Sequence, residues 1–522
     1  MLTIDCETTH VGPPQLDEGV THAPDHQEHS HHLARCHHGS CRVRRPDPRA
    51  GQRAHWQRKF RPASARAAQI GSEPASAAVP APVIQPDAAP GTGRCVNSVT
   101  TNVPQPTAAQ LEAAGLDQLP VAPIANRVDL VAPPFSNPTN VTNPFFPISD
   151  LRSAVLNGIV DGKVFRTETT LLPDTRVIQW SPGQCVETLV SQYVAYLDGR
   201  IEEAALDFYA QADDGSVWYF GEDVYNYRDG IIADTSGTWL AGKEGPIAMI
   251  MPADPAIGDV YRVENIVGLV FEEITVTELG RTVPGPGGPV DVMVVRQLHD
   301  DGSFADKLFG PGYGEFFTAH TGDSEGMALG VPVDAVAAPV PAQLVILLRG
   351  AYSVFDQAAM KDWKAAKATV EQMLAAWASH RGSGGVPPQL VGSTDVAIES
   401  LLSAIKVRNP GKARDAALDV AQATLDLQLQ FRQPADIDLA RLDLWARQVL
   451  VDAASGDVSA VSGDTATLEW MRDRVAHTLE PVVVTRIDTL LEELRTNARD
   501  ADLAAATETA TALREVMARA GS

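Results

Sequence analysis

Asp-Gly pairs recur through the middle of this chain, and each stands beside a run of β-branched or aromatic residues. Such a pair supplies the positive φ angles that a tight β-hairpin turn requires. The clearest case joins residues 206–211 to residues 217–223 through the turn at Asp214-Gly215, and the other pairs are at 161–162, 198–199, 229–230 and 301–302. The middle of the chain therefore predicts an antiparallel β-sheet.

Residues 150–320 also alternate between apolar and polar side chains, as strands with two different faces do. Leu206 and Phe208 fall on one face, whereas Asp207 and Tyr209 fall on the other. We expect seven to ten strands here. So many antiparallel strands without intervening helices must curl or stack to cover their apolar face, so we predict a curled sheet or half-barrel.

The last part of the chain, Pro339 to Ser522, changes to a helical period. One example of apolar residues at i, i+3, i+4 and i+7 is Ile398, Leu401, Leu402 and Ile405. Polar turns at Lys361-Asp362, Asn409-Pro410-Gly411, Gly456-Asp457 and Arg499-Asp500 are spaced 44 to 48 residues apart. This spacing is typical of stacked αα-hairpins, and it predicts about eight helices in an all-α bundle or short solenoid.

Composition divides the chain into three parts. Residues 1–95 hold nine of the thirteen histidines and four of the five cysteines, with almost no apolar periodicity, and a Pro- and Ala-rich stretch follows them. We therefore predict a disordered leader and linker over 1–134, with a short helix at 107–114, then a β domain over 135–330 and a helical domain over 339–522. We expect each domain to enclose its own core. A β domain followed by a separate helical domain gives a multidomain α+β fold class.

Charge and hydropathy limit the partners of this chain. The formal net charge is -24, although ten Lys or Arg and one acid lie between Arg35 and Arg66. An acidic surface repels phosphate backbones, so we expect no nucleic-acid partner. The longest apolar stretch, Val336 to Leu348, is about a dozen residues and contains two prolines, so we predict no transmembrane segment.

Several motifs resemble those of an uncharacterised family of exported bacterial β-rich proteins. The motifs are Asn143-Pro-Phe-Phe-Pro147, Tyr209-Ala-Gln211, Val217-Trp-Tyr-Phe-Gly-Glu-Asp223, Met251-Pro-Ala-Asp-Pro255 and Gly258-Asp-Val-Tyr-Arg262. The stretch Phe309 to Glu315 is also similar to the closing hairpin of periplasmic half-barrels of the lipoprotein-carrier type. These resemblances imply a periplasmic or extracellular location and a non-catalytic sheet, with no assigned activity.

The beginning of the chain predicts a different cellular location. Residues 1–20 include four acids and lack the positive start and apolar block of a secretory signal, which predicts a cytoplasmic protein if Met1 is the true start. The Arg, Pro, His and Ala bias of residues 30–90 favours another hypothesis, a misplaced start or shifted frame that has replaced an export signal. Cys185 and Cys95 could form a disulfide in an exported protein, whereas a free buried Cys185 fits an intracellular one.

Aromatic residues of the clearest hairpin are the first candidates for a ligand site. Trp218, Tyr219, Tyr225 and Tyr227 could line the mouth of a barrel and stack on an apolar or sugar ligand. Strand alternation sends half of such residues inward, where core packing alone would explain them.

Metal sites have two candidate groups. The acids Glu222 and Asp223 could supply oxygen ligands at the hairpin ends, and His31, His32, Cys36 and His37 could supply nitrogen and sulfur ligands. Neither group has the spacing of a known metal-binding module. Turn acids that accept backbone hydrogen bonds, and a disordered leader, explain these residues more simply.

Catalytic motifs are scarce, which favours a protein that is not an enzyme. Ser324 lacks the Gly-x-Ser-x-Gly context, and His299 with Asp301 is the one base with an orienting acid nearby in sequence. We therefore expect a binding or scaffold protein of the cell envelope or exterior without a cofactor, whose β domain holds an apolar or carbohydrate small molecule and whose helical domain docks a protein partner. The alternatives are a hydrolase that uses acids of the β domain and a metal-handling protein that uses the His-rich leader.

Overall fold

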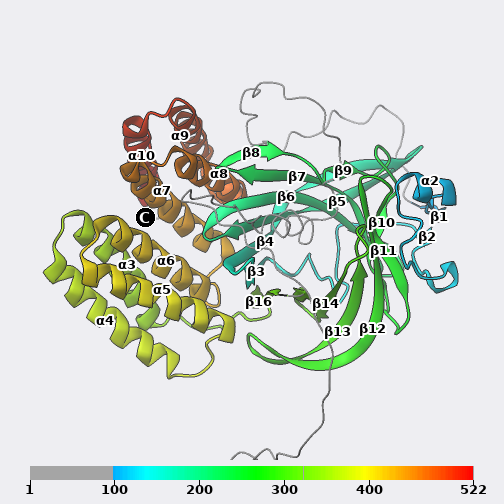
Figure 1. Ribbon diagram of the computed structural model, residues 1–522, viewed down its shortest axis with the longest axis horizontal. Helices are drawn as coiled ribbons and strands as arrows, with labels where there is room; N and C mark the ends of the chain where they lie inside the picture. Colours follow the sequence, from blue (N-terminus) through cyan, green and yellow to red (C-terminus); the bar gives the residue numbers. More distant parts are fainter. Residues whose placement is uncertain (1–97, 321, 521–522) are drawn as a thin grey trace, which may run out of the picture. The chain divides into compact units, whose positions relative to one another are not determined.

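The structure, a computed structural model, describes residues 98–320 and 322–520, and all of them fall within one compact unit. Its main feature is one large antiparallel sheet of fourteen strands (Figure 1). The strands are β3 Ser153–Val160, β4 Lys163–Ser181, β5 Gln184–Leu197, β6 Arg200–Gln211, β7 Val217–Arg228, β8 Ile231–Asp234, β9 Trp239–Leu240, β10 Ala248–Met251, β11 Val260–Ile266, β12 Val270–Gly285, β13 Gly288–Leu298, β14 Phe304–Gly310, β15 Gly314–His320 and β16 Asp323–Val331.

The predicted antiparallel sheet is confirmed, but the number of strands was underestimated. Strands such as β9, with two residues, and β10, with four, are too short to show an alternating pattern in the sequence. The Asp-Gly pairs lie in the hairpin turns as expected. In the β3–β4 turn, for example, Asp161 and Gly162 have φ angles of 53° and 72°, the left-handed conformation of a tight hairpin turn.

The sheet curls but does not close. Its hydrogen-bonded path runs β10-β7-β6-β5-β4-β3-β16-β15-β14-β13-β12-β11, while β8 and β9 pair with β7 outside that path. The two end strands, β10 and β11, come into contact without joining the ladder. We call the seam the region where β10, together with its partner strand β7, meets β11. The predicted curled sheet or half-barrel is therefore confirmed.

Residues 98–134 are more ordered than their linker-like composition suggests. They form β1 Thr101–Asn102, α2 Ala108–Ala113, a short 3₁₀ helix Ile124–Asn126 and β2 Val131–Ala132. The helix predicted at 107–114 is present, and Thr107 and Gln110 close its first turn as a capping box. The Asp129 carboxylate accepts the backbone N–H of Arg262, which fixes this segment to β11.

The C-terminal part contains the eight expected α-helices, arranged as four consecutive pairs. The helices are α3 Ala342–Ala359, α4 Trp363–Arg381, α5 Pro388–Val407, α6 Pro410–Gln428, α7 Pro434–Ser455, α8 Val458–Val475, α9 Pro481–Arg499 and α10 Leu503–Ala520. Each predicted polar turn lies between the two helices of a pair, and the side chains of Asp362, Asn409 and Asp457 cap the second helix of their pairs. In the part of the chain that the structure describes, no helix has the length and apolar character to cross a membrane.

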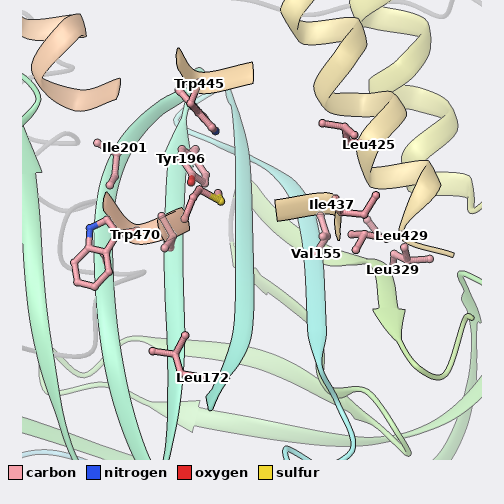
Figure 2. Packing of buried hydrophobic residues seen from close by; sticks show 14 of the residues in the cluster. Val155, Leu172, Tyr196, Ile201, Leu329, Leu425, Leu429, Ile437, Trp445 and Trp470 are labelled. Carbon is pink, nitrogen blue, oxygen red and sulfur yellow. The ribbon is translucent and has the colours of Figure 1, made fainter. Parts of the chain in front are cut away.

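The expectation of two separate cores is wrong. Buried hydrophobic residues of the sheet and of the helices form one continuous cluster, part of which is drawn in Figure 2. Trp445 of α7 stacks on Tyr196 of β5 with ring centroids 5.6 Å apart, and the indole N–H of Trp470 in α8 donates to the Tyr227 hydroxyl of β7 at 2.9 Å. One face of the sheet therefore finds its apolar partner on the helices.

Close backbone approach also joins the two parts. Gly230, in the β7–β8 turn, lies so near α8 that a Cβ atom there would be 2.0 Å from the Ser459 carbonyl oxygen. Gly230 has a φ of 75°, so glycine is needed both for the turn and for this contact.

Buried charges cross the same interface. The Glu168 carboxylate of β4 pairs with Arg474 of α8, with Arg166 at 2.6 Å and with Arg441 of α7 at 3.4 Å. Arg441 reaches Asp426 of α6 at 2.6 Å, and the side chains of Glu168, Arg441 and Arg474 are at most 1% exposed. Burial by itself would raise the pKa of Glu168, but the three arginines outweigh it and lower that pKa below its ordinary value.

Substitution of Glu168 by Gln should destabilise the protein strongly, because it leaves three arginines at a buried interface without their central anion. We expect a loss of about 3 kcal/mol in the free energy of unfolding at pH 7, measured by urea denaturation. Because the folded-state pKa of Glu168 is lowered, this contribution should be present above its ordinary pKa of 4.5 and disappear as the pH falls.

Asp306→Asn is the control for this prediction. It breaks the pair of Arg296 with Asp306, in which the two side chains are 57% and 63% exposed, and it should cost less than about 1 kcal/mol. Equal effects of the two substitutions would contradict a dominant role for the buried network.

Cys185, in β5, is disulfide-bonded, and its partner lies outside the described residues. Because the remaining cysteines are at positions 6, 36, 41 and 95, the sequence-based expectation of a bond to Cys95 is directly testable. Peptide mapping of the alkylated, unreduced protein should recover a peptide pair that links Cys185 to Cys95. Recovery of alkylated Cys185 from the native protein would contradict this expectation.

Candidate functional site: an acid-lined cavity inside the curled sheet

The curled sheet encloses a cavity of about 290 Å³ that is lined by residues from most of its strands. This volume is near the lower end of the range for small-molecule sites. On β6 the cavity-lining residues are Glu203, Ala205, Asp207 and Tyr209, so every second residue faces inward. The polar face of this strand therefore lines the cavity, and Leu206 and Phe208 face the opposite side of the sheet.

Apolar and aromatic side chains form part of the lining. The segment before β3 contributes Phe146, Ile148 and Leu151, and the strands add Leu171, Ile250, Ile274 and Phe309. Phe146 meets Tyr209 edge to face at 4.8 Å, and Tyr209 stacks on Tyr219 at the same distance. Phe146 belongs to the Asn143–Pro147 motif, so this motif supplies an apolar wall of the cavity.

The remaining lining is acidic. Seven carboxyl groups face the cavity, accompanied by one lysine and one histidine, and the acids are Glu203, Asp207, Glu222, Glu264, Glu272, Glu315 and Glu325. The two basic groups already have partners, since Lys307 Nζ lies 3.2 Å from Glu315 and His299 Nδ1 lies 2.8 Å from Glu272. Acids therefore outnumber bases in this cavity, and five of the seven acids are buried.

Asp207 lies beside the tyrosine pair. The Tyr219 hydroxyl donates to its carboxylate at 2.7 Å. Burial raises the pKa of Asp207 to about 7, and the hydrogen bond from Tyr219 offsets only part of that increase. Burial likewise raises the pKa of Glu325 to about 7, although the Thr167 hydroxyl donates to it. Both carboxyls can therefore exchange a proton near neutral pH.

Glu222 of β7 and Glu264 of β11 hydrogen-bond each other across the seam. Two carboxyl groups can make this contact only when one of them carries a proton. Burial is the main cause that raises the pKa of both groups, and neighbouring acids add to it. Glu222 is 2% exposed and Glu264 3%, so the pair is shielded from bulk water.

Four buried oxygen atoms of the cavity lining lack a hydrogen-bond partner within the described residues. They are Oγ of Ser191, Oε1 of Glu222, Oε2 of Glu264 and Oε1 of Gln297. Each belongs to a side chain that is more than nine-tenths buried and that lines the cavity. Buried polar atoms without a partner are costly, so acceptors left in this state indicate a site that a donor-bearing molecule completes.

The aromatic residues predicted as ligand contacts lie on different faces of β7. Tyr219 lines the cavity, whereas Trp218 is fully buried and its indole donates to Ser216 at 2.9 Å. Tyr225 packs against Trp470 of α8, where Tyr227 accepts a hydrogen bond. The structure therefore brings one of these four residues to the cavity and places two at the interface with the helices.

The acids predicted as metal ligands also diverge. Glu222 faces the cavity, and its neighbour Asp223 faces the other side of the sheet, where it pairs with Arg176 at 2.9 Å. His31, His32, Cys36 and His37 lie outside the described residues. Over residues 98–320 and 322–520, no group of three or more His, Cys, Asp or Glu side chains is arranged to hold a metal ion.

His299 pairs with an acid that is distant in sequence. Glu272, on the neighbouring strand β12, contacts the Nδ1 atom of His299. Asp301 instead accepts the backbone N–H of Ser303 in the β13–β14 turn. Glu272 was not predicted as a site residue from the sequence, nor were Glu203, Asp207, Glu264 and Glu325. The available signal was two acids four positions apart on one face of a strand, as in Glu203 and Asp207, but this spacing does not show whether such a face turns inward.

Comparisons with known proteins add no family to this description. No family model matches the chain, and no curated protein matches it in sequence.

Asp207→Asn should change how stability varies with pH. The unfolded chain ionises this residue near its ordinary pKa of 3.8, whereas the folded protein keeps the proton to about pH 7. The wild type should therefore lose stability relative to Asp207→Asn as the pH rises from 4 to 7, on the order of a few kcal/mol. Urea denaturation at several pH values measures the difference. A difference that does not vary with pH would contradict the raised pKa of Asp207.

Proposed function

We propose that this chain is a binding protein that holds a small molecule inside its curled sheet. The observation that carries the proposal is the set of unpartnered, buried acceptor oxygens of Glu222, Glu264 and Gln297 in a cavity of about 290 Å³. Apolar walls with a few convergent polar groups are typical of small-molecule sites. A ligand with an apolar part and hydrogen-bond donors matches this lining.

A hydrolase is the second candidate, and one observation favours it. The cavity combines Asp207 and Glu325, whose pKa values are each about 7, with a carboxyl pair that shares a proton. Carboxyl groups in such different environments can serve as acid and base. Binding without turnover supports the first proposal over the second.

We also propose that the protein acts outside the reducing cytoplasm. The disulfide at Cys185 supports this location, because disulfides persist mainly in oxidising compartments. The resemblance of the Asn143–Pro147 and neighbouring motifs to exported β-rich proteins supports it as well. A protein partner for the helical domain remains a proposal that follows from its exposed helix surfaces alone.

Intrinsic fluorescence tests the binding function directly. Trp239 lies 5.2 Å from Tyr219, so a molecule in the cavity should alter the emission of the aromatic cluster. Three probes share one apolar chain: octanol, octylamine and octyl glucoside, each used below its aggregation concentration. We expect saturable quenching by at least one probe and no change in the probe itself on prolonged incubation.

Two variants locate the binding. Ala205→Phe fills the cavity from β6 and should lower the affinity for the probe by at least tenfold. Val164→Phe adds the same ring at an exposed position of β4 and should leave that affinity unchanged. If Ala205→Phe fails to fold, Ala205→Leu replaces it. The binding function is wrong if no probe binds or if the cavity-filling variant binds as the wild type does.

A further inference from the structure

We propose that the ligand of this cavity carries an organic cation, an ammonium or guanidinium group, and that this group binds at the seam between Glu222 and Glu264. This inference rests on the proposed binding function and specifies its ligand class. It follows from the charge, the unpartnered acceptors and the position of the pair.

The charge balance of the cavity is the first argument. Lys307 and His299 pair with Glu315 and Glu272, and the charge of Lys307 also acts on Glu264 and Glu325. Among the described residues, no cation pairs directly with Asp207, Glu222, Glu264 or Glu325. Asp207 and Glu325 receive hydroxyl donors from Tyr219 and Thr167. Glu222 and Glu264 hydrogen-bond each other, a contact that requires a proton on one of the two carboxyl groups.

The geometry of acceptors is the second argument. Each acid of the pair keeps one oxygen without a partner, and the carbonyl oxygen of Gln297 on β13 is a third. An ammonium group has three donors and no acceptor, so it can satisfy several such oxygens at once. A neutral hydroxyl donates only one hydrogen and leaves the acids uncompensated.

The absence of a suitable inorganic site favours an organic ion. Calcium takes six to eight oxygen ligands, and within the described part of the chain no cluster of three potential ligand side chains is arranged for a metal. The cavity is also much larger than a bare ion requires, and part of its wall is apolar. An amine attached to an apolar body fits both features.

Binding should displace a proton. A cation between Glu222 and Glu264 takes over the role of the shared proton and favours ionisation of both acids. The charged groups that face this pair are Asp207 and Glu203 of β6, Glu272 of β12 and Lys307 of β14. Because the acids outnumber the lysine, affinity for a cation should rise as the pH increases from 6 to 8.

Calorimetric titration of the full chain with octylamine and octanol is the test, with buffers of different ionisation enthalpy to count released protons. At pH 7 we expect octylamine to bind at least tenfold more tightly than octanol or octyl glucoside and to release a fraction of a proton or more. A cation preference of less than twofold would overturn the proposal. If octanol or octyl glucoside still binds in the cavity, the binding function stands and only the cation is wrong, whereas no binding by any probe removes both.

Glu→Gln variants at the seam test whether binding depends on the charge of the two acids, because they keep the size of the side chains. Glu222→Gln alone leaves Glu264 able to ionise beside an amide donor, so the variant should keep most of its affinity for octylamine but lose the proton release. The double variant Glu222→Gln/Glu264→Gln should bind octylamine at least tenfold more weakly than the wild type, and its affinity for octanol should change less than twofold.

Asp223→Asn is the matched control, because it removes an acid from the next position of β7 on the opposite face of the sheet. It should leave the affinity for octylamine unchanged. An equal loss in this control and in the double variant would contradict binding at the seam. If the double variant does not fold, the proton release and pH dependence of the wild type decide the question.

Discussion

The two-residue alternation of a β-strand is the constraint on which this structure depends. In β6 it sends Asp207 and Tyr209 into the cavity and Leu206 and Phe208 to the other side. A sheet built this way has its polar face inside the curl, so its apolar face needs a cover from elsewhere in the chain. The helices supply much of that cover, which explains why the buried residues of the two parts form one cluster.

Buried ion pairs fix how the sheet and the helices are positioned at that interface. Apolar contacts between a sheet and helices are tolerant of small shifts, whereas the pairs of Glu168 with Arg166, Arg441 and Arg474 demand one arrangement. Removing water from these groups is costly, so such a network contributes less net stability than its attractions suggest. We infer that its main contribution is to select one relative position of β4, α7 and α8.

The cavity has the opposite balance of charge, with more acids than bases. Three arginines lower the pKa of Glu168, whereas burial and neighbouring acids raise the pKa values of Glu222 and Glu264. A protein under selection for stability alone would have apolar residues at such positions. Local departures from good packing and charge pairing tend to mark functional sites, which is why the cavity outweighs the rest of the surface as a candidate.

The local structure of this protein could be predicted from its sequence, because turns and helix caps depend on neighbours in the chain. The Asp-Gly hairpin turns, the helix at 107–114 and the four helical pairs were all predictable from spacing. Three features could not be predicted from local patterns: the face of the sheet that turns inward, the contact of Glu222 with Glu264 across the seam, and the single core that both parts share. These features depend on curvature and on contacts between residues far apart in sequence, and alternation alone gives two faces without saying which of them the curl encloses.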